Sequence, residues 1–107
     1  MSKTIRFQLA LAAVLLFAGV VGFAQSSGEA TYKAKCQGCH GATGLADTTI
    51  GKALKVKPVT DPAVGKFTEA EMLAATRNGL GKMQAFKDKL TEAEIKASVA
   101  YFRSLIK

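Results

Sequence analysis

Residues 36–40 read Cys-Gln-Gly-Cys-His and contain both cysteines and the only histidine of the 107-residue chain. In a shuffled sequence of this composition, the three residues would fall at this spacing on the order of once in several thousand trials. At positions i, i+3 and i+4 of a helix end, both sulfurs and the imidazole project to one side. This stretch therefore concentrates the sulfur and imidazole groups of the chain at a single point.

The pattern C-x-x-C-H is the attachment signature of c-type haem. Thioether bonds from Cys36 and Cys39 to the haem vinyl groups would leave the neighbouring nitrogen of His40 facing the iron. Three other interpretations compete with it. A Cys36–Cys39 disulfide suits an exported chain but closes a very short loop. A thioredoxin-like pair needs a βαβ context that is missing here, and a zinc site needs a fourth ligand. Only haem also accounts for the histidine.

The first 24 residues have the pattern of an export signal. Lys3 and Arg6 precede an apolar stretch from Leu9 to Ala24, which ends on small residues at the two positions that signal peptidase reads. A membrane span needs about 20 apolar residues, so this stretch is at the short limit and retention as an anchor is the alternative. We expect cleavage near Ala24 and export to the periplasm, which leaves residues 25–107 as the folded domain.

The size and charge of that domain narrow its function. Its 83 residues bury only about 60–65% of the unfolded surface, so a scaffold of this size normally needs a staple such as a metal or a covalent cofactor. This size argues against a two-domain enzyme with a closed cleft. Without the signal, 13 Lys and Arg stand against 8 Asp and Glu, a net charge of +5. No nucleic-acid motif or block of basic residues occurs, so nucleic acid is not expected as a partner.

Helix-capping patterns predict an all-α fold of three or four helices. A Ser or Thr is followed three positions later by Glu in three capping boxes, at residues 26–29, 68–71 and 91–94. Asp61-Pro62 is a further cap, with Pro at the first helical position. The last helix has an apolar stripe made of Ile95, Val99, Phe102 and Ile106. Nothing alternates with a period of two over a strand length, and residues 41–60 and 79–90 are expected to be loops.

The sixth ligand of a haem iron must come from elsewhere in the chain. There is no second histidine, which leaves Met, Lys or an open position. Met72 lies in a predicted helix, where a core methionine is the ordinary interpretation. Met83 lies in a glycine-rich loop that can fold over the open haem face, and it is the preferred candidate.

The domain resembles the small bacterial monohaem c-type cytochromes of class I. The resemblance rests on three stretches in this order: CQGCHG at 36–41, RNG at 77–79 before MQAF at 83–86, and LTEAEI at 90–95 leading into AYFRSL at 100–105. It implies an all-α fold wrapped around one covalently attached haem c, with the first and last helices crossing and Tyr101 among the packing residues. One departure is Gln84, because similar loops often have Pro after the ligand Met, and Gln lacks the fixed φ of Pro.

The same resemblance implies the site and the function. Cys36 and Cys39 would bind the haem, His40 would be the proximal ligand of the iron, and Met83 the distal one. The protein would be a monomeric single-electron carrier, not an enzyme, between a redox donor and a redox acceptor in the periplasm. If residues 1–24 remain, it would instead be the haem-bearing subunit of a larger membrane oxidoreductase. If Met83 is not a ligand, a gas-sensing or peroxidatic haem protein is the alternative.

Three further expectations concern the surroundings of the haem. His40 should donate its other ring N–H to a backbone carbonyl, either in the Thr48–Gly51 loop or near Pro58. Candidates for the dry wall around the porphyrin, or for plain core, are Leu54, Val59, Leu80 and Phe86. Exposed lysines flank the two loops and could steer an acidic partner or simply be solvated; they are Lys52, Lys55, Lys57, Lys82, Lys87 and Lys89.

Overall fold

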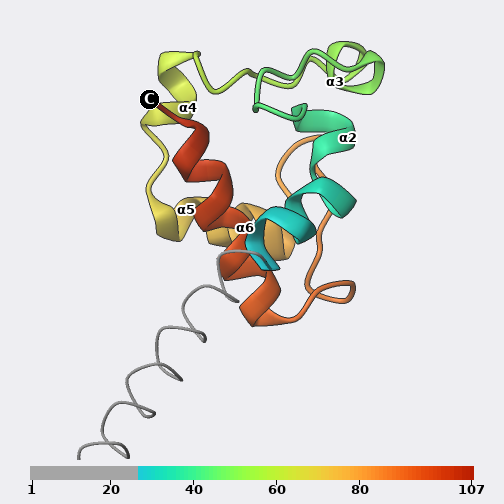
Figure 1. Ribbon diagram of the computed structural model, residues 1–107, viewed down its shortest axis with the longest axis vertical. Helices are drawn as coiled ribbons and strands as arrows, with labels where there is room; N and C mark the ends of the chain where they lie inside the picture. Colours follow the sequence, from blue (N-terminus) through green and yellow to red (C-terminus); the bar gives the residue numbers. More distant parts are fainter. Residues whose placement is uncertain (1–26) are drawn as a thin grey trace, which may run out of the picture.

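The computed structural model describes residues 27–107 (Figure 1). Residues 27–35 are helical and lead through a turn at Cys36 into α2 (Gln37–His40). The helices α3 (Thr49–Ala53), α4 (Pro62–Gly65), α5 (Glu69–Asn78) and α6 (Glu92–Leu105) follow. This part of the chain contains no strand, only an isolated bridge between Leu80 and Met83. The all-α prediction is confirmed, while the signal sequence expected at residues 1–24 and the cap at Ser26 lie outside the described residues.

The predicted helix starts are observed with their hydrogen bonds. Thr68 and Thr91 form complete capping boxes with Glu71 and Glu94 at the starts of α5 and α6. Asp61 Oδ1 accepts a hydrogen bond of 2.9 Å from the backbone N–H of Ala63 at the start of α4. These caps satisfy backbone N–H groups that the helix itself cannot pair.

The loop expected at 41–60 contains a helix that the sequence analysis missed. The short helix α3 begins after Thr48, whose hydroxyl accepts a hydrogen bond of 2.9 Å from the N–H of Gly51. This cap has no Glu at the third helical position, so the capping-box pattern does not find it. The second expected loop, residues 79–90, is observed between α5 and α6.

The first and last helical segments cross at Gly28. A Cβ atom at this buried position would lie 2.5 Å from the carbonyl oxygen of Ala97 in α6, so only glycine allows the two backbones to come this close. One turn further on, Tyr32 is 1% exposed and packs against α6, with its ring centroid 5.1 Å from that of Tyr101 and 6.3 Å from that of Phe102. The crossing and the packing role of Tyr101 are therefore confirmed.

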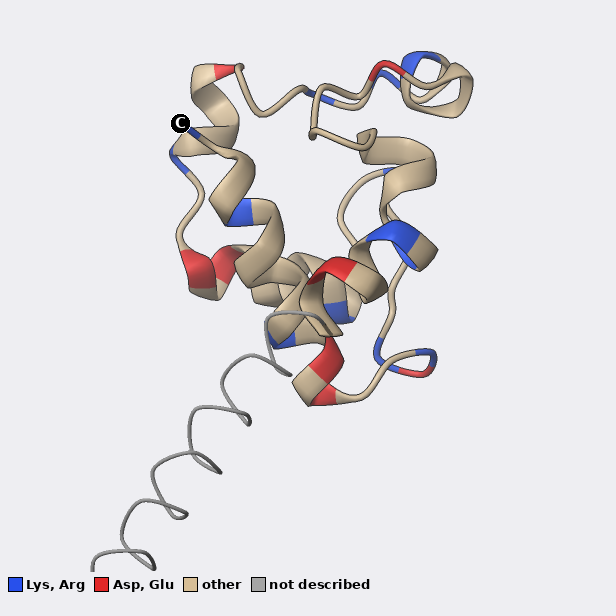
Figure 2. Cartoon of the chain, in the orientation of Figure 1, with Lys and Arg blue, Asp and Glu red and all other residues tan. Residues whose placement is uncertain are grey.

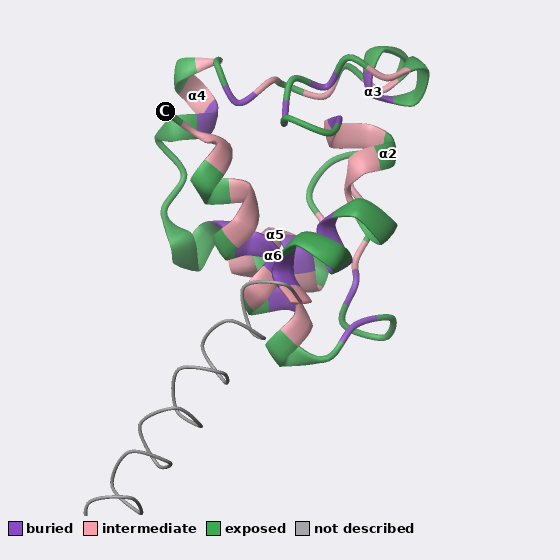
Figure 3. Cartoon of the chain, viewed as in Figure 1, coloured by how far each residue is buried: buried purple, intermediate pink, exposed green. Residues whose placement is uncertain are grey.

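The buried residues gather where α5 and α6 meet (Figure 3). In the predicted stripe of α6, Ile95 and Val99 are buried, while Phe102 and Ile106 are half-buried. Ile95 forms a hydrophobic cluster with Phe86 and Leu90. No helix within residues 27–107 is long and apolar enough to cross a membrane.

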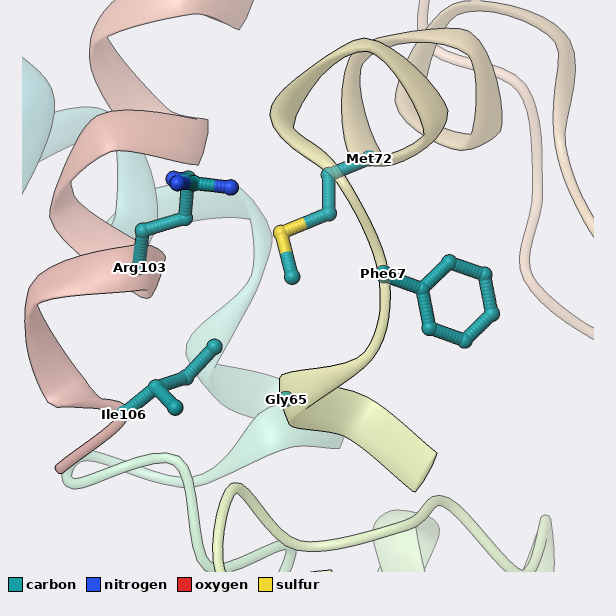
Figure 4. Close-up of a pocket in the computed structure, with 5 residues that line it drawn as sticks. All are labelled: Gly65, Phe67, Met72, Arg103 and Ile106. Carbon is teal, nitrogen blue, oxygen red and sulfur yellow. The ribbon is translucent and has the colours of Figure 1, made fainter. Parts of the chain in front are cut away.

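Met72 is a buried residue of α5, as expected for a core methionine. Its side chain faces a pocket of about 240 Å³ (Figure 4). The pocket lies between the α4–α5 connection and the end of α6, and it is lined by Gly65, Phe67, Met72, Arg103 and Ile106. Met72 is thus part of the packing between α5 and α6.

Candidate haem site

The motif at residues 36–40 folds into a single turn. The N–H of Cys36 donates to the carbonyl of Tyr32 at 2.8 Å, and the N–H of His40 donates to the carbonyl of Cys36 at 2.9 Å. Cys36, Cys39 and His40 are all half-buried, so the three predicted site residues share one helical turn. Hydrogen bonds between residues four positions apart close this turn.

The two thiols are free and are not bonded to each other. Burial raises the pKa of Cys36 to about 11, with a smaller contribution from Cys39. Redox-active cysteines in C-x-x-C motifs have a lowered pKa instead, because the thiolate is the reactive form. The structure therefore gives no support to a disulfide or a thioredoxin-like pair.

His40 presents a half-buried imidazole beside these thiols. Its ring meets Phe102 edge-on, with the ring centroids 5.2 Å apart, and burial lowers the pKa of His40. The ring is thus held in its neutral form, which is the form that binds a metal. Its Nδ1 atom is buried and has no hydrogen-bond partner among the described residues, so the expected carbonyl partner is not observed.

These observations fit a covalently attached haem. An unpartnered buried polar atom costs about 1–3 kcal/mol, so a neutral imidazole is kept in this state only if something else compensates. Two free thiols and a neutral imidazole in one turn are the donor set that a c-type haem uses. Across residues 27–107, no three His, Cys, Asp or Glu side chains come together as a metal-binding cluster, which leaves a zinc site without its remaining ligands.

The segment that follows the motif forms hydrogen bonds back to it. The hydroxyl of Thr48 donates to the carbonyl of Gly38 at 2.7 Å, and the N–H of Ala46 donates to the carbonyl of His40 at 2.8 Å. Thr48 therefore caps α3 and ties α3 to α2 with the same hydroxyl. Sequence reasoning missed this role, because a Thr before a short glycine-containing helix has no distinctive pattern.

Met83 lies in the loop between α5 and α6. Its backbone pairs with Leu80 through N···O distances of 2.9 and 3.1 Å, and the N–H of Phe86 donates to the carbonyl of Thr76 in α5 at 2.9 Å. Gly79 begins this loop at φ 82°, and a Cβ there would lie 2.8 Å from the carbonyl oxygen of Met83. The loop is therefore folded back on the end of α5, with Met83 half-buried in it.

Two side chains around Met83 bear on how firmly it is held. Met83 packs against the cluster of Phe86, Leu90 and Ile95. Gln84, which stands where related loops often have Pro, accepts a hydrogen bond of 2.5 Å from Nζ of Lys89. Both Gln84 and Lys89 are exposed, so this hydrogen bond competes with water and contributes little.

The helix α6 packs against both parts of the site, the motif at residues 36–40 and the Met83 loop. Phe102 contacts His40, and Ile95 belongs to the cluster on which Met83 packs. Seven residues separate Phe102 from Ile95, which is two helical turns, or about 10 Å along the same face. The relative placement of the motif and the Met83 loop therefore depends on how each packs against α6.

The remaining candidates divide between core and surface. Phe86 and Val59 are buried within the protein itself, Leu54 is half-buried, and Leu80 is 57% exposed. Phe86 belongs to the hydrophobic cluster, so plain core explains it. The six lysines named above are all exposed, and basic side chains recur along α3 and its flanking segments, whereas acidic ones mark the starts of α5 and α6 (Figure 2).

Comparison with known proteins finds a matching family, a similar sequence and a similar structure. Residues 23–102 match the family described as cytochrome c oxidase, cbb3-type, subunit III. Over 76 residues the chain is 34% identical to cytochrome c6 of Leptolyngbya boryana, which covers 71% of this chain and 86% of that protein. Among solved structures, it is similar to the KustC0563 c-type cytochrome with a TM-score of 0.67 and 30% identity, over 75% of this chain and 98% of that chain.

Proposed function

Because this chain belongs to the c-type cytochromes, in the family of subunit III of cbb3-type cytochrome c oxidase, we propose that it is a monohaem electron carrier of the periplasm. The observation that carries the proposal is the turn at residues 36–40, which holds two free thiols beside a neutral, half-buried imidazole. Similarity to a cytochrome c6 supports a small carrier protein over an enzyme.

In this proposal Cys36 and Cys39 hold one haem c through thioether bonds, and His40 is the proximal ligand of its iron. The bound haem would supply a one-electron couple between Fe(II) and Fe(III). The part of the protein is to keep His40 neutral by burial and to fix its backbone through α2 and the hydrogen bond from Thr48. Fixed ligands keep reorganisation small, which suits electron transfer.

Met83 is proposed as the distal ligand. Its support is its position in a loop whose backbone is pinned to Leu80 and to the end of α5, together with the lack of a second histidine in the sequence. A thioether sulfur is a soft ligand that favours Fe(II) and raises the reduction potential relative to a second imidazole. It also closes the sixth position against oxygen or peroxide.

The optical spectrum of the protein, expressed in cells that mature c-type cytochromes, tests these assignments. A sharp band at about 550 nm after reduction indicates covalent haem, and a weak band at about 695 nm in the oxidised protein indicates Met83 ligation. The first band without the second would point to Lys or to an open position, which binding of CO to the reduced protein would then distinguish. The absence of both bands would refute the proposal.

Export and partner choice form the second part of the proposal. We infer that residues 1–24 are removed near Ala24, so mass spectrometry of the mature protein should find an amino terminus at Gln25.

The exposed lysines around α3 and the Met83 loop would steer an acidic redox partner, in which case the rate of electron transfer falls steeply as ionic strength rises. A rate that does not depend on salt would exclude steering.

A second candidate is the haem-bearing subunit of a larger membrane oxidoreductase. The family description favours it, because the matching family is named for an oxidase subunit. Fractionation of native cells into periplasm and membranes distinguishes the two functions. A carrier is recovered as a monomer with a processed amino terminus, whereas a subunit is recovered in a complex with residues 1–24 retained.

A further inference from the structure

Tyr32 is a buried phenol with a specific partner beside the motif. Its side chain is 1% exposed, and its hydroxyl donates to the carbonyl oxygen of Gly41 at 2.6 Å. Gly41 is the residue directly after His40. Burial raises the pKa of Tyr32 to about 12, so the hydroxyl keeps its proton and remains a donor at neutral pH.

Gly41 is held at both of its backbone polar groups. Its N–H donates to the carbonyl of Gln37 at 2.8 Å. Its carbonyl accepts a short hydrogen bond of 2.6 Å from Tyr32 and a longer one of 3.3 Å from the N–H of Gly44. Gly41 also leaves α2 at φ 82°, a conformation in which the chain turns sharply away from the helix. The hydroxyl of Tyr32 therefore fixes the direction in which the backbone leaves His40.

Packing alone does not require this hydroxyl. The ring of Tyr32 is enclosed by Tyr101 and Phe102 of α6, and a phenylalanine would fill the same volume and keep both ring contacts. Phe102 in turn contacts the ring of His40. Tyr32 is thus linked to His40 twice, through the backbone at Gly41 and through the ring of Phe102.

The hydroxyl also has an electrostatic effect. Its O–H dipole offsets the negative end of the Gly41 carbonyl in a buried region, where such dipoles interact strongly. Without the hydroxyl, that carbonyl would keep only the longer hydrogen bond of 3.3 Å from the N–H of Gly44, or would admit water. Either change stabilises the extra positive charge of ferric iron over ferrous iron and so lowers the reduction potential.

We propose that Tyr32 is a positioning residue, which fixes the backbone after His40 through Gly41 and raises the reduction potential of the haem. The inference rests on the proposed function, since it presumes that His40 binds the iron. It also gives a function to the hydroxyl of Tyr32, which the packing of the crossing helices does not require.

The test compares Tyr32→Phe with Tyr101→Phe in the haem-bearing protein. Tyr101 is half-buried in the same aromatic group, and its hydroxyl makes no hydrogen bond to any described residue, so Tyr101→Phe is the matched control. Tyr32→Phe should keep the band at about 550 nm but lower the reduction potential and shift the His40 ring resonances in the NMR spectrum of the oxidised protein. Tyr101→Phe should leave both readouts at the wild-type values.

A Tyr32→Phe protein that loses thermal stability but keeps the wild-type potential and His40 resonances would overturn the proposal, because a merely structural role predicts that result. Wild-type protein without the band at about 550 nm would instead refute the proposed function, so the two failures are distinguishable.

If Tyr32→Phe yields no holoprotein, incorporation of fluorotyrosine in place of tyrosine provides the second test. The chain has two tyrosines, so the Tyr101→Phe background leaves Tyr32 as the only labelled site. A stronger donor there should raise the potential, and an unchanged potential overturns the inference.

Discussion

The two halves of the site are held in different ways. The turn at 36–40 is closed by hydrogen bonds between residues four positions apart, and all its chemistry lies in five consecutive residues. The Met83 loop is held by other elements, because the N–H of Phe86 donates to the carbonyl of Thr76 in α5 and Met83 packs against the cluster that includes Ile95 of α6. The first half is encoded locally, whereas the second depends on tertiary packing. A variant should therefore be able to lose ligation by Met83 and still keep the haem. A variant that loses the haem cannot keep ligation by Met83.

The largest effect is expected from His40→Ala. Loss of a residue that only supports a metal ligand already costs about 10–100-fold in metal affinity, so loss of the ligand itself should remove nearly all low-spin haem protein. The measurement is the yield and the visible spectrum of the purified protein. Met72→Leu is the control, because it exchanges a buried side chain of α5 for one of similar volume and removes no proposed ligand, so it should keep the wild-type spectrum. A wild-type spectrum from His40→Ala would contradict the ligand assignment.

The next largest effect is expected from Gly79→Ala, which should change only the loop that carries Met83. Gly79 has φ 82° and ψ 163°, a conformation nearly restricted to glycine, and a Cβ there would lie 2.8 Å from the carbonyl oxygen of Met83. The strain should lower the free energy of unfolding by about 1–3 kcal/mol. The band at about 695 nm should weaken or vanish while the band at about 550 nm remains, since the covalent attachment lies elsewhere.

Gly81→Ala provides the matched control for Gly79→Ala. Gly81 lies in the same loop with φ 58°, and nothing lies within 4 Å of a Cβ built there. This variant should keep the band at about 695 nm and lose about 1–2 kcal/mol at most from its left-handed conformation. Equal loss of the band in both variants would show that general loop strain, and not the contact with Met83, is responsible.

The sequence predicts most of the contacts between residues that are close in the chain and few of the contacts between different elements. Thr68, Thr91 and Asp61 mark helix starts because each cap involves residues two or three positions away. The hydrogen bonds from Tyr32 to Gly41 and from Thr48 to Gly38 span nine and ten positions, and no periodicity or capping rule reports them. The site follows the same division, since residues 36–40 can be recognised as a motif, whereas the packing of Met83 against the cluster of Phe86, Leu90 and Ile95 is known only from the fold.

Replacing Gln84 with Pro should strengthen the Met83 side by a smaller amount. The N–H of Gln84 makes no backbone hydrogen bond among the described residues, and Met83 before it is paired in an extended bridge, which suits a residue preceding Pro. Where the backbone is compatible, such a change stabilises by about 0.4–1 kcal/mol. The temperature at which the band at about 695 nm disappears should rise.

Gln84→Ala separates the ring of Pro from the loss of the Gln84 side chain. It removes the hydrogen bond from Lys89 without fixing φ, and because both residues are exposed the loss should be slight. If Gln84→Pro melts no higher than Gln84→Ala, the rigidity of this position does not limit how firmly Met83 is held.

The smallest effect concerns α6, on which both halves of the site pack. The carboxylate of Glu94 accepts a hydrogen bond of 3.0 Å from the N–H of Thr91, and this bond lowers the pKa of Glu94 from its ordinary value of 4.5. The unfolded chain therefore binds this proton more readily, so the stabilisation is complete above the ordinary pKa and is lost as pH falls through the lower, folded value. Between about pH 5 and pH 3, the melting temperature of Glu94→Gln should fall slightly less than that of the wild type. Thr91→Ala keeps the carboxylate and its bond to the backbone N–H but removes the smaller effect of the Thr91 side chain on the pKa of Glu94, so it should be less stable at every pH and keep most of the wild-type pH dependence. A Glu94→Gln protein with the wild-type pH dependence would mean that other carboxylates govern the acid stability of α6.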